Sequence, residues 1–430
     1  MTTRYGRRII VLTSMAVLAA ACSSSGQGSN QAQPKGPLQI SIFESFSGAN
    51  AAYGPEAAAG CYPAIRLINA DGGVLGHQLA CLPVDDKGDP ADAVPAANKL
   101  LASGSSLVGS LGVGSDVATT VMPLFEQAKI PVFSTTGQAS FDKSTFTYFW
   151  RNLAPDDAQG YAMALAVKKL GYTSAAAVFG NDIAAQGTAP TAIKGMHKLG
   201  INLVANQALA LDQGSYRSEV QQLVTGRAHA IVSEADPQTS ATYLSELSQQ
   251  GHLVPMITDT VSQEPSWIKA VSGAIGRSQL SKLDTIVIPY APTSTLAYRT
   301  YTASLLASKA HVPQPAQWNS DLYSVADYDA VVIMALAMIA AHTTTPSVYN
   351  SYITKVTSPS PNAVVVHTFA AGKRALLAGK QIQYIGASGP SVFNRYHNSG
   401  GGFEMIRLTP SGKTVLVGPI TAAEVQRLSG

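Results

Sequence analysis

Residues 38–84 read LQISIFESFSGANAAYGPEAAAGCYPAIRLINADGGVLGHQLACLPV, and this stretch decides the fold. The β-branched run 38–43 predicts a strand. A helix is expected over 55–70, because a proline suits its first turn and the apolar residues that follow recur near helical spacing. Asp71-Gly72-Gly73 ends this helix, and a second strand is expected over 77–84. A strand, a helix and a strand in this order predict one unit of a parallel sheet covered by helices.

The same alternation continues to residue 133 and starts again after Asp156. It predicts two α/β units of similar size, each with its own sheet. The length of 430 residues also favours two lobes, because it exceeds what one core usually supports. Two further helices are expected over 296–308 and 325–341, before a β-rich tail that runs over 383–418.

The composition is that of a core-rich protein without an electrostatic partner. Hydrophobic residues make up 46% of the chain and charged residues 13%, with a net charge of +3. Because the basic residues are scattered, we expect no binding to nucleic acid. The apolar run 330–341 is too short to span a membrane and predicts a buried helix.

The first residues indicate export. A basic start precedes a short apolar run that closes as Leu18-Ala19-Ala20-Ala21-Cys22, and a polar tract follows. This pattern predicts a signal peptide over 1–21. It resembles a bacterial lipoprotein signal, which implies a lipidated Cys22, a tether over 22–37 and a membrane-anchored protein on the extracytoplasmic face. The alternative is an ordinary signal peptide whose cysteine is incidental.

Two cysteines remain in the exported part, Cys61 and Cys81. Because disulfides persist outside the cytoplasm, a bridge between them is favoured. Two buried free thiols are the alternative, since both cysteines have apolar neighbours. The cysteines show no metal-ligand spacing, and no metal site is expected.

No catalytic motif is present. The chain lacks a G-x-S-x-G elbow, an H-E-x-x-H pair, a P-loop and a dinucleotide fingerprint. Cofactors such as ATP and NAD(P)H are not freely available outside the cytoplasm, so we expect neither a cofactor nor an enzymatic activity. A secreted hydrolase is the minor alternative.

Five strings in order resemble the type I periplasmic substrate-binding proteins of branched-chain amino acid ABC transporters. They cover nearly all of the exported chain. The strings are Ser45-Phe46-Ser47-Gly48-Ala49-Asn50-Ala51-Ala52-Tyr53-Gly54, Ile68-Asn69-Ala70-Asp71-Gly72-Gly73-Val74-Leu75-Gly76, Asp85-Asp86-Lys87-Gly88-Asp89-Pro90, Tyr328-Asp329-Ala330 and Ile385-Gly386-Ala387-Ser388-Gly389-Pro390-Ser391-Val392-Phe393.

The resemblance implies an α/β fold of two doubly wound parallel-sheet lobes joined by a three-crossover hinge. Ligand is then held in the cleft between the lobes, a small polar solute such as an amino acid or a related amide or carboxylate. An ABC permease is the implied partner, and a monomer is expected. A lobe pair that senses a ligand for a signalling partner is an alternative. The implied boundaries are 38–155 and 285–375 for the first lobe, and 156–284 and 376–430 for the second lobe and tail.

The resemblance also implies ligand contacts from the first lobe. Ser115 stands at a helix start that receives the ligand's carboxylate in the family, and free amides at such a start attract anions. A plain capping role is equally possible, and the neighbouring Asp116 disfavours an anion. Ser134, Thr136 and Gln138 lie in the family's second contact loop. Tyr53 stands where an aromatic residue covers the ligand; a surface tyrosine packed on Pro55 is the alternative.

Contacts from the second lobe are expected at strand ends. Asp182 lies in the loop after the lobe's first strand, where the family's tyrosine is replaced by Ile183. Glu234 and Asp259 follow later strands, and their carboxylates suit an ammonium group. Each acid taken alone could equally be a solvated loop residue or a helix cap.

Overall fold

The computed structural model describes residues 35–48, 50–104, 106–290 and 293–429. The expected signal peptide, Cys22 and the tether up to residue 34 lie outside the described residues. Strand β1 begins at Lys35, three residues before the start expected for the first strand at Leu38.

The first lobe is built on a five-stranded parallel sheet in the order β2-β1-β3-β4-β5. Its strands are β1 (Lys35–Glu44), β2 (His77–Asp85), β3 (Leu107–Gly112), β4 (Val132–Ser134) and β5 (Phe149–Trp150). The helices between them are α1 (Tyr53–Ala70), α2 (Pro90–Leu101), α3 (Ser115–Ala128) and the 3₁₀ helix η1 (Ala139–Phe141).

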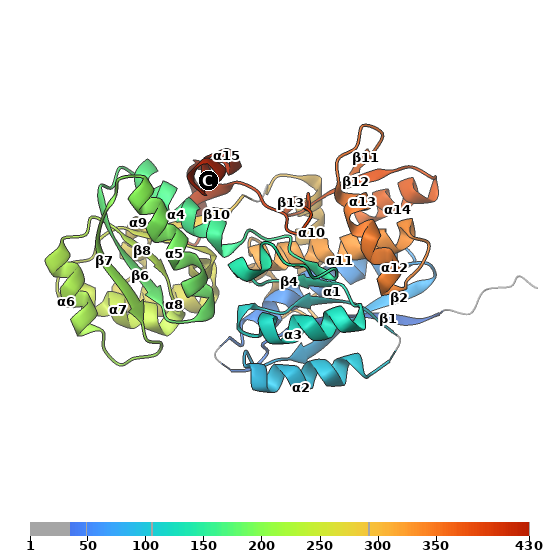
Figure 1. The fold of residues 1–430 in the computed structure, drawn as a ribbon, viewed down its shortest axis with the longest axis horizontal. Helices are drawn as coiled ribbons and strands as arrows, with labels where there is room; N and C mark the ends of the chain where they lie inside the picture. Colours follow the sequence, from blue (N-terminus) through green and yellow to red (C-terminus); the bar gives the residue numbers. More distant parts are fainter. Residues whose placement is uncertain (1–34, 49, 105, 291–292, 430) are drawn as a thin grey trace, which may run out of the picture. The chain divides into compact units, whose positions relative to one another are not determined.

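Helices cover both faces of this sheet, because neighbouring side chains of a strand point to opposite faces. Ile42 packs into the core that α1 shares with a later helix, whereas Phe43 packs into the core under α2 and α3. Figure 1 shows α2 and α3 running side by side below the strands. Burial on both faces explains why the strands read as continuous apolar runs.

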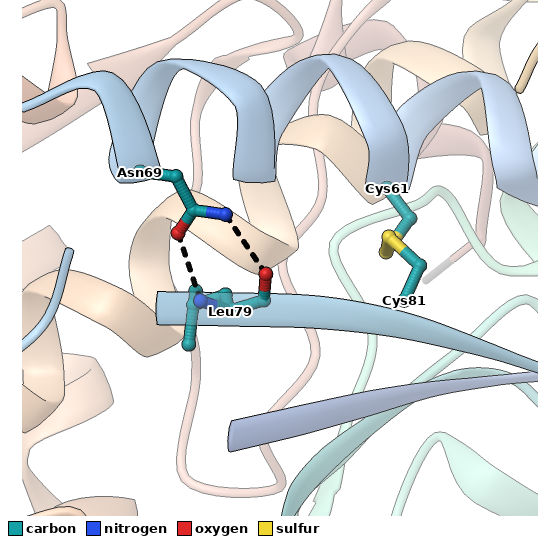
Figure 2. Close-up of a disulfide and its surroundings, with 4 residues drawn as sticks. All are labelled: Cys61, Asn69, Leu79 and Cys81. Carbon is teal, nitrogen blue, oxygen red and sulfur yellow. Dashed lines mark hydrogen bonds between the residues drawn. A yellow bond between two sulfur atoms is a disulfide. The ribbon is translucent and has the colours of Figure 1, made fainter. Parts of the chain in front are cut away.

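A disulfide and an asparagine join α1 to the edge strand β2 (Figure 2). Cys61 and Cys81 are bonded, with their Cα atoms 6.2 Å apart, which is the pairing that the sequence favours. Near the end of α1, Asn69 Nδ2 donates to the carbonyl oxygen of Leu79 (2.9 Å), and the Leu79 amide donates to Asn69 Oδ1 (2.8 Å). Asn69 thus pairs with the strand as a neighbouring backbone would.

The second lobe has a seven-stranded sheet in the order β15-β14-β10-β9-β8-β6-β7, in which β14 and β15 are antiparallel. Its strands are β6 (Ser174–Gly180), β7 (Asn202–Leu209), β8 (Ile231–Glu234), β9 (Met256–Thr258), β10 (Asp284–Pro289), β14 (Phe403–Leu408) and β15 (Thr414–Ile420). Its helices are α4 (Asp156–Lys169), α5 (Ile183–Lys198), α6 (Arg217–Gly226), α7 (Pro237–Gln249), η2 (Thr260–Gln263), α8 (Pro265–Ile275), α9 (Arg277–Leu283) and α15 (Ala422–Ser429).

This sheet is also covered on both faces. Ala177 and Phe179 of β6 pack with α4, α5 and α15, whereas Ala176 and Val178 pack with α6, α7 and α8. The predicted fold class, two doubly wound α/β lobes, is therefore confirmed.

The segment between the two parts of the second lobe packs on the first lobe. It contains α10 (Leu296–Leu306), η3 (Pro315–Trp318), α11 (Leu322–Ala340), α12 (Pro346–Tyr349), η4 (Asn350–Tyr352), α13 (Ile353–Thr357), β11 (Val364–Val366), α14 (Phe369–Leu377), β12 (Ile382–Gly386) and β13 (Gly389–Pro390). Strands β11, β12 and β13 form a small sheet of their own.

The expected boundaries of this segment need correction. Residues 285–289 belong to β10, which pairs with β9 and β14 of the second lobe, so the return to the first lobe follows Pro289 rather than residue 284. Tyr384 and Phe393 belong to the first lobe's core, so the return to the second lobe comes after Phe393 rather than at residue 376. The pairing of β10 with distant strands sets the first boundary, and the packing of Tyr384 and Phe393 in the first lobe's core sets the second.

Helix α11 has the length and composition of a membrane span but lies inside the protein. Its mean hydropathy is 1.7, and 94% of its apolar window is buried. Ile333 and Leu336 belong to the same core as Ile42, which agrees with the buried helix predicted for this run.

Two of the crossovers between the lobes run side by side. The Arg151 amide donates to the carbonyl oxygen of His397 (3.0 Å), and the Ser399 amide donates to that of Arg151 (2.8 Å). The rings of Trp150 and His397 stack with their centroids 3.8 Å apart. The first crossover therefore has a hydrogen-bonded partner in the last.

Candidate functional site

A cavity, part of it open to solvent, is lined by residues of both lobes. The first lobe contributes polar residues at the start of α1, at the start of α3 and after β4: Tyr53, Ser115, Thr135 and Gly137. The second lobe contributes residues of α4 and α5 and of the ends of β8 and β9: Asp156, Gln159, Ala184, Thr188, Glu234, Asp259, Thr260 and Val261. The first crossover and α11 supply Leu153, Ala154, Leu322 and Tyr323, and Pro289 completes the wall.

Ser115 lies in this cavity as the first residue of α3, after the N-cap Gly114. Its hydroxyl oxygen is 3.2 Å from that of Thr136. The Gln138 side-chain amide donates to the carbonyl oxygen of Ser115 (2.9 Å). Ser115 is therefore the predicted first-lobe residue whose hydroxyl a ligand can reach, and the loop after β4 holds it in place.

Ser134, Thr136 and Gln138, expected to contact ligand, do not line the cavity. Ser134 and Thr136 are almost fully buried. The Ser134 hydroxyl donates to the carbonyl oxygen of Val113 (2.8 Å) and accepts from the Thr136 amide (3.1 Å). Their side chains shape the loop, and it is the intervening residues Thr135 and Gly137 that reach the cavity.

Arg151 supports the same loop from beneath. Its side chain is fully buried and donates to the carbonyl oxygens of Thr136 (3.2 Å) and Gln138 (3.3 Å). It also forms an ion pair with Asp142. Because its Nη1 and Nη2 atoms are engaged in this way and the residue is absent from the lining, Arg151 acts as a brace for the site.

Two tyrosines lie in the wall. Tyr53 belongs to α1, which begins two residues earlier than expected, and it lines the cavity. Tyr323, in the first turn of α11, was not identified from the sequence. Its position among helical residues offered no local signal.

Glu234 and Asp259 face the cavity from the second lobe. They stand at the ends of the neighbouring parallel strands β8 and β9, where ligands of open α/β sheets usually bind. Glu234 is 8% exposed and Asp259 is 5% exposed. Glu234 Oε2 and Asp259 Oδ1 have no hydrogen-bond partner among the residues that the structure describes. Buried polar atoms are rarely left so, which makes both acids candidate ligand contacts.

Asp156 is a third acid of the cavity that sequence reasoning missed. It is the first residue of α4, and its amide donates to the carbonyl oxygen of Gly137 (2.8 Å). A Cβ atom at Gly137 would lie 1.6 Å from its Oδ1, and one at Gly187 would lie 2.4 Å from its Oδ2. A glycine from each lobe therefore leaves room for this carboxylate, whose Oδ2 is buried without a partner in the described part of the chain.

Asp182 is predicted to bind ligand, but it does not line the cavity. It is the N-cap of α5 and accepts a hydrogen bond from the Ala185 amide (2.9 Å). The neighbouring Ile183 is 48% exposed and also lies outside the lining. The helix start that follows this aspartate is the signal that identifies it as a cap.

The environment of these acids disfavours their ionised form. Burial, reinforced by the charges of Asp259 and Asp156, raises the pKa of Glu234 well above its usual range. Burial and the charge of Glu264 do the same to the pKa of Asp259. Burial raises the pKa of Asp156 to about 7, although Arg151 acts in the opposite direction. Both desolvation and like charge act on the same set of carboxylates.

The described residues offer no group of three His, Cys, Asp or Glu side chains arranged to hold a metal ion. The cavity instead combines hydroxyls, carboxylates and two aromatic rings.

Comparisons with known proteins agree with this arrangement. A model of the periplasmic binding protein family matches residues 37–401. The Leu/Ile/Val-binding protein BraC3 of Rhizobium johnstonii is 32% identical over 133 residues, which are 31% of this chain and 36% of that protein. An amino acid binding protein of Pseudomonas aeruginosa is 23% identical over 253 residues, 55% of this chain and 66% of that protein. The chain thus aligns with less than two thirds of either relative.

Among solved structures, the substrate-binding protein LivJ of a branched-chain amino acid transporter from Streptococcus pneumoniae, in complex with isoleucine, has the same fold. The TM-score is 0.70 at 17% identity, over 89% of this chain and all of LivJ (100%). The named relatives are binding proteins and not enzymes, in agreement with the expectation from the sequence. Because the family model spans most of the sequence, the chain belongs to the periplasmic binding protein family and has the type I fold of the branched-chain amino acid-binding proteins.

Proposed function

We propose that the protein binds a small polar solute, an amino acid or a related amide or carboxylate, and delivers it to an ABC transporter permease. The observation that carries this proposal is a cavity whose walls come from both lobes and whose floor holds the unpaired, buried carboxylates of Glu234 and Asp259. The relatives' names as amino acid and Leu/Ile/Val-binding proteins support the same class of solute.

The lining suggests how such a solute is oriented. The Ser115 hydroxyl meets a carbonyl or other acceptor end from the first lobe, and Tyr53 covers the solute. Glu234 and Asp259 receive its ammonium or other donor end from the second lobe. Since each end of the solute is bound by a different lobe, the solute gains contacts when the lobes close and thereby stabilises the closed form.

A thermal-shift screen tests this function. The purified protein is heated with amino acids, small amides, urea and aromatic acids, and calorimetry follows on each compound that raises the melting temperature. We expect reversible binding of at least one of them without chemical change. Turnover of the bound compound would overturn the proposal, as would the absence of binding throughout the set.

The membrane anchor is a separate part of the proposal, because Cys22 lies outside the described residues. Acyl chains on Cys22 would keep the binding protein next to its permease. Labelling of cells with a palmitate analogue should mark the wild-type protein and leave Cys22→Ala unmarked. Equal labelling of both proteins would contradict the anchor and leave the binding function untouched.

A further inference from the structure

The charges around the cavity are of one sign. Asp156, Glu234 and Asp259 line it, and its described lining contains no Lys, Arg or His side chain. The nearest buried cation, Arg151, is held by Asp142 and by loop carbonyl oxygens. A zwitterionic amino acid would therefore find carboxylates for its ammonium group and no cationic side chain for its carboxylate.

A helix start can substitute for a cation, because its amides and dipole attract an anion. Among the described residues, five α-helices contribute residues near their N-termini to this cavity: α1, α3, α4, α5 and α11. Each already has an acidic residue of its own at the N-cap or in the first turn: Glu56 in α1, Asp116 in α3, Asp156 in α4, Asp182 at α5 and Asp321 at α11. These carboxylates offset the positive helix ends and leave little attraction for a ligand's anionic group.

The unpaired carboxylate oxygens indicate that the ligand supplies hydrogen-bond donors. Oδ2 of Asp156, Oε2 of Glu234 and Oδ1 of Asp259 are buried without partners in the described structure. Each can accept a hydrogen bond from an N–H donor, and three acceptors around one cavity match the several donors of an ammonium or guanidinium group. Burial and mutual repulsion raise the pKa of each of these acids, and a cation would relieve the repulsion.

We propose that the solute is a small organic cation, an amine or guanidinium compound of net positive charge whose other end is an uncharged hydrogen-bonding group. Its cationic group lies among Asp156, Glu234 and Asp259, and its uncharged end meets Ser115. An organic rather than a metal cation is favoured, because the described residues hold no cluster of metal-ligating geometry. This inference rests on the proposed binding function and narrows its solute class.

Four probes that share one carbon skeleton test the charge. Leucinamide is a cation that is largely protonated at pH 7, leucine a zwitterion, 4-methylpentanamide neutral and 4-methylpentanoate an anion. 4-Guanidinobutanamide, a cation with an uncharged amide end, and the zwitterion 4-guanidinobutanoate form a second, longer pair. Calorimetry should give at least tenfold tighter binding for leucinamide than for leucine, or for 4-guanidinobutanamide than for 4-guanidinobutanoate, as the gain of charge-assisted contacts predicts.

Substitutions of the acidic residues test where the cationic group of the solute binds. Glu234→Gln and Asp259→Asn should each weaken binding of the preferred cation about tenfold or more and reduce its advantage over the zwitterion. Asp157→Asn is the matched control, because Asp157 follows Asp156 in the same helix turn but does not line the cavity. It should keep wild-type affinity, and thermal melts verify that each variant is folded.

The possible outcomes distinguish a failure of the cation inference from a failure of the proposed binding function. Tightest binding of leucine, 4-guanidinobutanoate, the neutral amide or the anion would overturn the cationic solute and leave a solute-binding protein. Binding of the cations with unchanged affinity in Glu234→Gln and Asp259→Asn would overturn the assigned site. No binding of these probes or of any compound in the broader screen would overturn both proposals.

Discussion

The Thr135 hydroxyl donates a 2.6 Å hydrogen bond to Oε1 of Glu44, although the two residues are 91 positions apart. Glu44 ends β1 and Thr135 follows β4, so the bond spans the intervening strand β3 at the edge of the sheet that faces the cavity. Glu44 is 2% exposed. A carboxyl group therefore lies directly beneath one wall of the site.

Glu44 should make the protein less stable as pH rises. Burial, together with the charge of Asp86, raises its pKa from 4.5 to about 8. Between these pH values the folded state keeps a proton that the unfolded chain has lost, so the stability that this group contributes is complete below pH 4.5 and is lost as pH rises through 8. Asp86, Asp116, Glu56 and Asp327 are the acids that interact with it.

Urea unfolding at pH 5, 7 and 9 measures this effect. Glu44→Gln should remove up to about 1.4 kcal/mol per pH unit of the wild-type decline over this window. Asp212→Asn, at an exposed residue of the second lobe, should retain the full decline. Parallel curves for Glu44→Gln and wild type would show that Glu44 titrates normally.

Ser115→Ala should weaken binding of whichever solute the thermal-shift screen identifies. It removes the hydroxyl that lines the cavity and with it one hydrogen bond, worth about 1.5–3 kcal/mol if the bond is to a charged group. Thr119→Ala, at an exposed hydroxyl one turn further along α3, is the control. Calorimetry that finds wild-type affinity in Ser115→Ala would place the contact elsewhere.

Binding of 4-guanidinobutanamide, which stays cationic over this range, should strengthen as pH rises from 5.5 to 8. Burial raises the pKa of Asp156 to about 7 and raises the pKa values of Glu234 and Asp259 above their usual range, and a bound cation favours the ionised form of each acid, so binding releases protons. The groups that face these acids are Arg151, Asp142, Asp157, Asp182 and Glu264. Calorimetry in buffers of different ionisation enthalpy counts the protons; a pH-independent affinity would contradict the prediction.

Asp329→Ala should destabilise the first lobe by about 3 kcal/mol or more. Its carboxylate accepts from the Tyr384 hydroxyl (2.8 Å), the amides of Ala387 (2.9 Å) and Ser388 (2.7 Å), and the Ser388 hydroxyl (2.6 Å). Loss of the acceptor leaves several buried donors unsatisfied. Ser388→Ala, which removes one of these bonds, should cost about 1 kcal/mol in the same urea titration. Equal effects of both changes would be inconsistent with this network.

The disulfide between Cys61 and Cys81 should leave no free thiol to titrate, and it should stabilise the folded protein. It closes a loop of 20 residues, for which the loss of unfolded-chain entropy predicts about 3 kcal/mol. The unfolded, unreduced protein should show neither thiol, and the double variant Cys61→Ala, Cys81→Ala should melt at a lower temperature. Two reactive thiols in the unreduced protein would show that the bridge does not form.

Local sequence patterns predicted the helices and strands better than they predicted which strands pair with one another. Apolar runs such as 175–179 are buried parallel strands, as expected, because both faces of the sheet are covered. The run 285–289 is expected to begin the return to the first lobe, but it pairs with β9 of the second lobe. Nothing in five residues shows which sheet they will join, because strand pairing depends on contacts distant in sequence.

The prediction of site residues from local sequence meets the same limit. Glu234 and Asp259 were predictable because carboxyl ends of parallel strands meet at one edge. Asp156 lies at a helix start, where an acidic residue is equally suited to capping, and only the approach of Gly137 and Gly187 shows that its carboxylate reaches the cavity. Asp182 has the same local pattern and is a cap.

The buried helix α11 also matters before the protein folds. An exported chain crosses the membrane unfolded, and a segment with the length and hydropathy of Leu322–Ala340 can stop there as a transmembrane anchor. Asp327 and Asp329 lie within this helix. Each aspartate near the middle of a membrane helix costs about 2.5–3.5 kcal/mol on insertion scales. On this scale the two aspartates, including the Asp329 that holds the loop at Ser388 in the folded protein, should disfavour retention of the unfolded segment in the lipid.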